Sequence, residues 1–123
     1  MPLNPSSHVN SNKYILKIAS PEDLETKIYR ASTGSIEIPE LEMILEPGIQ
    51  ADFFITNIER VLLKFKEICE YMLKDNENVT IKDLLEKRIR DIGDLLAVKR
   101  EFTLILEDPE GFSYVLPKTD NPK

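Results

Sequence analysis

The stretch SIEIPELEMILEPG, residues 35–48, contains two apolar patterns of opposite parity. The apolar residues before Pro39 are even-numbered, and those after it are odd-numbered: Leu41, Met43 and Leu45. Pro39 has no N–H for a sheet ladder, so it fits an edge strand, a bulge or the start of a strand. We predict that Pro39 marks a bulge or a strand break, which would let both apolar sets face one core. A role for Pro39 in a binding site is the alternative.

Turn signals and β-rich runs predict further short strands on both sides of this stretch. KYILKI, KIYRAS and DFFI are strand candidates, and SPEDL has the signature of a single helical turn capped by Ser20. Pro47 and Gly48 match the central positions of a type II turn. In DPEG, Pro109 and Gly111 occupy the positions that they favour in a type I turn, so we predict a β-hairpin between EFTLILE and FSYVL.

The apolar period changes from two to 3.6 at Thr56, which predicts a pair of helices. Thr56 and Glu59 form a capping-box pattern, followed by an amphipathic helix that ends near Lys74. After the breaker DNEN, a second apolar stripe begins with a cap at Thr80 and includes Ile81 and Leu84. Gly93 falls inside this stripe, where close packing against the first helix or early fraying would explain it. We therefore predict an antiparallel helical hairpin at about residues 57–98.

The resulting order is strands, an inserted helical hairpin, then strands. It predicts an α+β, mainly β fold: a small barrel or sandwich formed by residues 13–116 as one domain. Residues 1–12 are expected to form a flexible arm or linker and residues 117–123 a flexible tail. A parallel α/β sheet is disfavoured because helices do not alternate with the strands.

Charge and hydropathy exclude several classes of partner. Sixteen Lys and Arg residues stand against 22 Asp and Glu residues, and the net charge of −6 disfavours nucleic acid and anionic membranes. The first twelve residues have no signal-peptide apolar core, and no run approaches the roughly 18 apolar residues of a membrane span. We expect a cytoplasmic protein whose single cysteine, Cys69, is a buried structural thiol.

Few residues of the chain could perform catalysis. With one histidine, His8, in the expected arm and one cysteine, tetrahedral zinc binding and a Cys–His or Ser–His triad are excluded within the domain. The four glycines are isolated, so no phosphate-binding loop is present. Carboxylates gather in residues 37–46 and 107–110; they fit a solvated strand face or, if functional, an acidic surface for a basic partner.

Several blocks in the chain resemble the ZPR-type zinc-finger proteins. The blocks are SPEDL, IPELE, PG, the TNIE segment at residues 56–59, and LEDPEG, and the resemblance covers about residues 14–116. It implies a domain of double-stranded β-helix type with a helical-hairpin insertion, which in this family follows a four-cysteine zinc ribbon. The resemblance also implies a partner, because eukaryotic members of the family bind translation elongation factor 1-alpha and assist its folding. No CxxC pair precedes Lys13, so zinc is expected only in a ribbon that this chain lacks, and no cofactor is expected in the chain itself.

The resemblance also suggests roles for particular residues. Structural roles as bulge, cap or turn fall to one set of positions: Pro39, Gly48, Thr56, Glu59, Pro109 and Gly111. Partner-facing roles are expected for Glu37, Glu40, Glu42 and Asp108. The predicted function is a non-enzymatic protein-binding module that recognises elongation factor 1-alpha; the alternatives are a cupin-like small-molecule-binding domain or enzyme, and a structural or oligomerisation domain.

Overall fold

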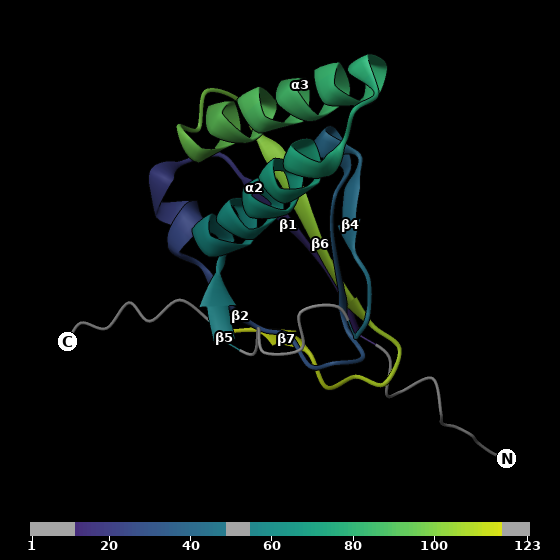
Figure 1. Ribbon diagram of the computed structural model, residues 1–123. Helices are drawn as coiled ribbons and strands as arrows, with labels where there is room; N and C mark the ends of the chain where they lie inside the picture. Colours follow the sequence, from purple (N-terminus) through teal and green to yellow (C-terminus); the bar gives the residue numbers. More distant parts are fainter. Residues whose placement is uncertain (1–11, 49–54, 117–123) are drawn as a thin grey trace, which may run out of the picture.

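The computed structural model of the chain describes residues 12–48 and 55–116, which form a mainly β domain with two long helices (Figure 1). In chain order the elements are strand β1 (Asn12–Ile18), 3₁₀ turn η1 (Pro21–Glu25), β2 (Lys27–Tyr29), β3 (Ser35–Ile38), 3₁₀ turn η2 (Pro39–Leu41), β4 (Met43–Leu45), β5 (Ile55–Asn57), helices α2 (Ile58–Asp75) and α3 (Val79–Leu96), β6 (Phe102–Asp108) and β7 (Tyr114–Val115). β1 begins one residue before the predicted domain boundary. The DFFI strand prediction lies mostly outside the described residues, and only its last residue, Ile55, is in β5.

The strands form two antiparallel sheets. One sheet has the order β1-β6-β3-β4, and the other has the order β5-β2-β7. Both sheets supply side chains to a single core, which includes Ile18, Ile28, Ile36, Phe102 and Leu106. The helical hairpin lies between β5 and β6 in sequence and covers one side of this core (Figure 1).

The opposite parities around Pro39 arise because β3 and β4 form a hairpin. Ile36 pairs with Leu45, and Ile38 pairs with Met43. Paired residues of an antiparallel ladder lie on the same face, and here each pair joins an even number to an odd one. The connection is the turn η2, which Glu42 closes with a left-handed φ of 56°. The predicted strand break is therefore confirmed, and the alternative of a bulge is wrong.

The helical hairpin is confirmed, but both predicted caps are wrong. Asn57 caps α2 by accepting a hydrogen bond from the Arg60 N–H to its Oδ1 (2.9 Å). Thr56 belongs to β5 instead, so the predicted capping box with Glu59 does not form. Asn78 caps α3 in the same way through the Ile81 N–H (3.2 Å). Each helix begins after an asparagine with extended backbone, because its short side-chain amide reaches the free N–H groups of the first turn.

Only the part of each helix near the sheets is buried. The core residues of α2 include Phe65 and Cys69, and those of α3 are Leu85, Ile92 and Leu95. Cys69 is buried as expected, with its Sγ 4.0 Å from the Met43 Sδ. Burial is the main reason that the pKa of its thiol is raised. No helix in residues 12–48 and 55–116 is long and apolar enough to cross a membrane.

The chain after β6 departs from the predicted hairpin. The turn itself forms as expected, with the Gly111 N–H donating to the Asp108 carbonyl oxygen (3.0 Å) and Gly111 at a φ of 77°. β7 does not return along β6, however; it pairs with β2 through Tyr29 and Tyr114. The buried carboxylate of Asp108 redirects this segment into the second sheet. The predicted turn at Gly48 also has the expected positive φ, 83°.

Candidate interaction surfaces

The acidic residues around the β3–β4 turn are held by contacts within the domain. Glu40 Oε1 accepts a hydrogen bond from the Thr103 N–H at 2.9 Å, which ties the turn to β6. Glu42 Oε1 lies 3.0 Å from Arg88 Nη2, which ties the turn to α3. Glu37 is half-buried on the outer face of the four-stranded sheet, in register with Ile44 and Ile105. Partner contact by these three carboxylates stays a prediction.

Asp108 cannot face a partner, because its side chain is completely buried. Its Oδ2 accepts hydrogen bonds from the Ser113 hydroxyl (2.7 Å) and from the N–H groups of Ser113 (2.8 Å) and Phe112 (3.1 Å), while Oδ1 accepts one from the Glu110 N–H (2.9 Å). The expectation of a partner-facing Asp108 is therefore wrong. The carboxylate gathers the N–H groups of residues 110–113, so this segment curls around Asp108 and cannot form a ladder along β6.

The environment of Asp108 favours its charged form. Burial alone raises the pKa of this carboxyl, but the hydrogen bonds from Ser113 and from the backbone outweigh burial and hold the pKa below its usual value. The buried Thr33 hydroxyl also lowers this pKa, although its contact with the carboxylate falls outside strict hydrogen-bond geometry.

Ser113 joins three segments of the chain at the same point. Its Oγ accepts a hydrogen bond from the Ala31 N–H at 2.9 Å while donating to Asp108. The Asn12 side-chain amide donates to the carbonyl oxygens of Gly111 (2.9 Å) and Ser113 (3.1 Å). Because Asp108 and Ser113 are covered on all sides, the geometry assigns this cluster a structural role, and it offers no exposed nucleophile.

Arg30 is a buried cation that no sequence pattern singled out. Only 2% of its surface is exposed, and its Nε donates to the Gly34 carbonyl oxygen at 3.0 Å while Nη2 donates to the Glu46 carbonyl oxygen at 2.6 Å. Burial lowers the pKa of the guanidinium. Arg30 thus connects the loop before β3 to the segment after β4. In KIYRAS an arginine beside β-formers resembles a solvent-exposed strand residue, so no pattern would have found it.

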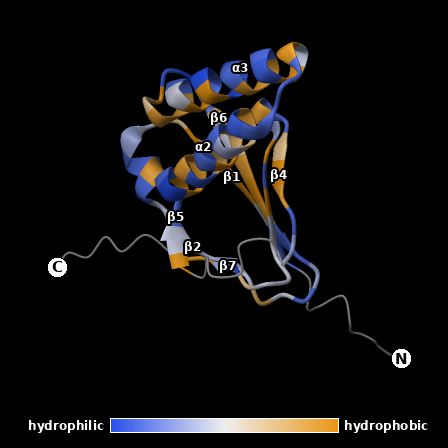
Figure 2. Ribbon diagram, viewed as in Figure 1, coloured by the Kyte–Doolittle hydropathy of each residue, from blue (hydrophilic) through white to orange (hydrophobic). Residues whose placement is uncertain are grey.

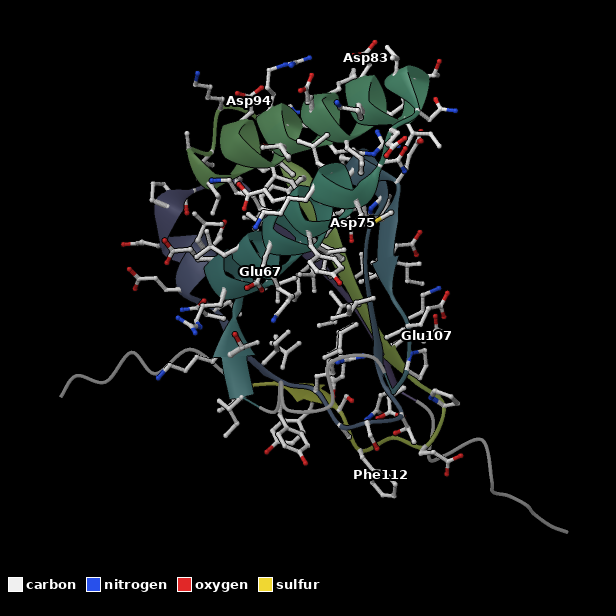
Figure 3. All side chains as sticks on the ribbon, in the orientation of Figure 1. Glu67, Asp75, Asp83, Asp94, Glu107 and Phe112 are labelled. Atoms are coloured by element: carbon white, nitrogen blue, oxygen red, sulfur yellow. The ribbon has the colours of Figure 1, made fainter. Side chains whose placement is uncertain are left out.

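The far end of the helical hairpin carries uncovered apolar side chains. No residue from Glu70 to Leu84 is buried, and we call this segment the hairpin tip. Figure 2 shows apolar segments at the joined ends of the two helices, and Figure 3 labels Asp75 and Asp83 within the same segment. The sequence placed Ile81 and Leu84 on a core-facing stripe, but both are exposed. The exposed large apolar residues of the tip are Tyr71, Met72, Val79, Ile81 and Leu84.

A groove of about 610 Å³ lies between β5 and α2 and extends along α2 as far as Glu70, where the hairpin tip begins. Glu67, labelled in Figure 3, lies on the side of α2 that lines it. The groove is lined by two apolar residues, a threonine of β5 and five charged residues of α2. They are Ile55, Thr56, Arg60, Leu63, Lys64, Lys66, Glu67 and Glu70. Within the described parts of the chain, no three His, Cys, Asp or Glu residues come together as a metal site would require.

Two antiparallel sheets around one core, with a helical hairpin inserted between β5 and β6, define a jelly-roll domain of double-stranded β-helix type. The family model of the ZPR1 jelly-roll domain matches residues 22–123, so the chain belongs to this family. The fold and the family expected from the sequence blocks are both confirmed.

Several proteins are similar in sequence to most of the chain. An uncharacterised ZPR1-like protein of Methanocaldococcus jannaschii is 38% identical over 104 residues, which cover 85% of this chain and 52% of that protein. Zinc finger protein ZPR1 of Drosophila melanogaster is 30% identical over 110 residues, which cover 89% of this chain and 24% of that protein. The zinc finger chaperone of Schizosaccharomyces pombe is 31% identical over 107 residues, which cover 84% of this chain and 23% of that protein. The chain thus spans about half of the archaeal relative and about a quarter of the eukaryotic ones.

Proposed function

We propose that this domain is a non-enzymatic protein-binding module that acts in the cytoplasm, and that its partner is translation elongation factor 1-alpha, whose folding it assists. The observation that carries the proposal is the hairpin tip, where no side chain is buried and five large apolar residues are exposed. The name of the fission yeast relative, a zinc finger chaperone, supports a protein client. The 123 residues contain a single cysteine, which supports the proposal that a zinc ribbon used in this function lies outside this chain.

The tip is suited to contact a protein more than a small molecule. It consists of the end of α2 and the first turns of α3, which project beyond the sheets (Figure 1). Exposed apolar patches on soluble domains mark interaction sites, and tyrosine and methionine are enriched in protein interfaces. Neighbouring acidic residues, Glu70, Asp75, Glu77 and Asp83, give the patch a polar rim that favours a basic partner surface.

Titration calorimetry with elongation factor 1-alpha in its GDP and GTP forms tests the proposal. We expect measurable heat with at least one form. The Leu84→Glu variant should weaken binding by about tenfold or more, because it places a charge in the apolar contact. The matched control is Ile15→Glu, which makes the same change at a 64% exposed position on the four-stranded sheet and should bind as the wild type does. Absence of heat with both nucleotide forms would refute the proposal.

The assisting role needs a second measurement, because binding alone does not show it. Elongation factor 1-alpha diluted from denaturant should regain nucleotide binding in higher yield with the domain present, and the Leu84→Glu variant should lose this gain. Equal yields with and without the domain would reduce the proposal to simple binding.

A further inference from the structure

The groove between β5 and α2 shares only Glu70 with the hairpin tip and differs from it in chemistry. Its two apolar lining residues, Ile55 and Leu63, are 65% and 43% exposed, so their side chains are accessible to an apolar group of a ligand. Three basic residues of α2 line the same groove. Glu67 and Glu70 line it as well, so the lining has only a small net positive charge, on a chain whose net charge is −6.

Two of the three basic side chains are already paired. Lys64 Nζ lies 3.1 Å from Glu67 Oε1, and Lys66 Nζ lies 3.9 Å from Glu70 Oε2. The Arg60 side chain has no hydrogen bond or ion pair within residues 12–48 and 55–116. A guanidinium presents several N–H donors in a planar fork that matches a carboxylate, so the exposed Arg60 is free to pair with an acidic partner.

Two further features of the groove favour a group that accepts hydrogen bonds. Thr56 is only 6% exposed, and its hydroxyl has no hydrogen-bond partner in the described part of the chain. The first turn of α2 lies beside it, and the positive end of a helix dipole stabilises a negative charge. Arg60, Thr56 and the start of α2 therefore favour the same kind of ligand from one side of the groove.

We infer that this groove binds a segment of a partner protein in which a carboxylate side chain is flanked by an aliphatic one. The carboxylate pairs with Arg60 and accepts a hydrogen bond from Thr56, and the aliphatic side chain packs against Ile55 and Leu63. The inference rests on the protein-binding function proposed above, but it names a different surface, so either can fail without the other.

An acidic peptide fits the groove better than RNA does. The net charge of −6 opposes a polyanion, because counterion release requires many basic contacts, and only Arg60 is unpaired here. Among the described residues that line the groove, none is aromatic and able to stack on a base. One carboxylate beside an aliphatic group requires only the single cation and the two apolar residues that the groove provides.

Two-dimensional ¹⁵N NMR of the chain with the synthetic peptide acetyl-Glu-Leu-Asp-Ile-Glu-amide tests the inference. We expect saturable shifts in the amides of residues 55–70, with an affinity in the range of about 1 mM or tighter. The Gln-Leu-Asn-Ile-Gln counterpart, which lacks the charges, should bind about tenfold more weakly. Absence of shifts in residues 55–70, or equal affinity for the two peptides, would overturn the inference.

Variants separate the groove from nonspecific charge. Arg60→Gln should weaken peptide binding by about tenfold, and Arg60→Lys should recover part of the loss, because a lysine keeps the charge without the planar fork. The matched control Arg90→Gln removes an exposed arginine of α3 outside the groove and should leave the affinity unchanged. Thr56→Val should weaken binding by about threefold.

The remaining outcomes are equally decisive. Equal losses in Arg60→Gln and Arg90→Gln, or tighter binding of poly(U) RNA than of the acidic peptide, would contradict the inference. If the wild type binds the peptide in the groove but elongation factor 1-alpha gives no heat, the groove stands and the proposed client is wrong. If the factor binds and the peptide does not, the reverse holds.

Discussion

Ser113 occupies the space that a side chain on Gly34 would need. A β-carbon placed on Gly34 would collide with Ser113 Oγ and would also lie 3.3 Å from Ser113 Cβ and 3.4 Å from the Ala31 carbonyl oxygen. The backbone of Gly34 does not have a positive φ, so close approach explains the glycine, not conformational freedom. The same Oγ bonds both Ala31 and Asp108, which makes this contact the point where the loop before β3 meets the segment before β7.

Gly34→Ala should therefore lower the free energy of unfolding by about 1–3 kcal/mol, as expected for overpacking at a site that cannot relax freely. Urea unfolding at pH 7 measures the effect. In a Ser113→Ala background the same change should cost less, because the colliding oxygen is gone. An equal cost in both backgrounds would show that the collision is not the cause.

Asp108→Asn should reduce stability and also change how stability depends on acid. At pH 7 we expect a loss of about 1–3 kcal/mol, because the amide places N–H donors where Ser113 and the backbone also donate. The folded-state pKa of Asp108 is lowered, so its contribution is present above the unfolded pKa of about 3.9 and disappears as the pH falls through the folded value. The wild type should lose unfolding free energy from about pH 5 downward, and the variant should lose less of it.

The control for this pH dependence is the neighbouring Glu107, which is exposed. Glu107→Gln should keep the acid dependence of the wild type. Parallel curves for wild type and Asp108→Asn in urea unfolding between pH 2 and 7 would show that Asp108 is not the group responsible.

The sequence was sufficient wherever a local pattern determines the structure. The change of period at residue 56, the turn glycines at 48 and 111 and the parity change at Pro39 all depend on neighbouring residues, and each led to an element that the structure contains. The partner of β7 depends on a carboxylate that bonds backbone groups up to five residues away, and no periodicity records this. The observed helix caps lie one residue from the predicted one in α2 and two residues from it in α3. Threonine and asparagine can both cap a helix, and only the three-dimensional structure selects between them.

The candidate interaction surfaces were harder to predict for a related reason. Ile81 and Leu84 fit the helical spacing of a core stripe, and spacing cannot tell a helix that is covered along its whole length from one that projects beyond its sheets. Arg60 looks like any charged residue on an amphipathic helix, and only the positions of Glu67 and Glu70 show that its neighbours are paired while it is not. Sequence patterns identify faces of elements, whereas a surface site depends on where the elements end.

Gly93→Ala should stabilise the domain. Gly93 lies within α3, whose helix continues to Leu96, so neither close packing against α2 nor early fraying accounts for the glycine. A β-carbon on Gly93 would meet no atom within 4 Å. Alanine should raise the free energy of unfolding by about 0.5–1 kcal/mol through helix propensity, measured by the urea midpoint. Gly48→Ala, at a φ of 83°, should do the opposite although it also meets nothing, and a gain in both variants would contradict this explanation.

Thr56→Val should also raise the free energy of unfolding, by about 1 kcal/mol. It replaces a buried hydroxyl, which has no partner among residues 12–48 and 55–116, with a methyl group of the same size. Valine is equally suited to a strand, so the backbone of β5 should not change. Thermal unfolding measures the gain, and Thr103→Val on β6, where the side chain is half-buried, is the control expected to stay within about 0.5 kcal/mol of the wild type. The two readouts of Thr56→Val should move in opposite directions, with stability rising and binding of the acidic peptide falling. A loss of stability would mean that the hydroxyl has a partner in the folded protein, and the position would then be a structural one.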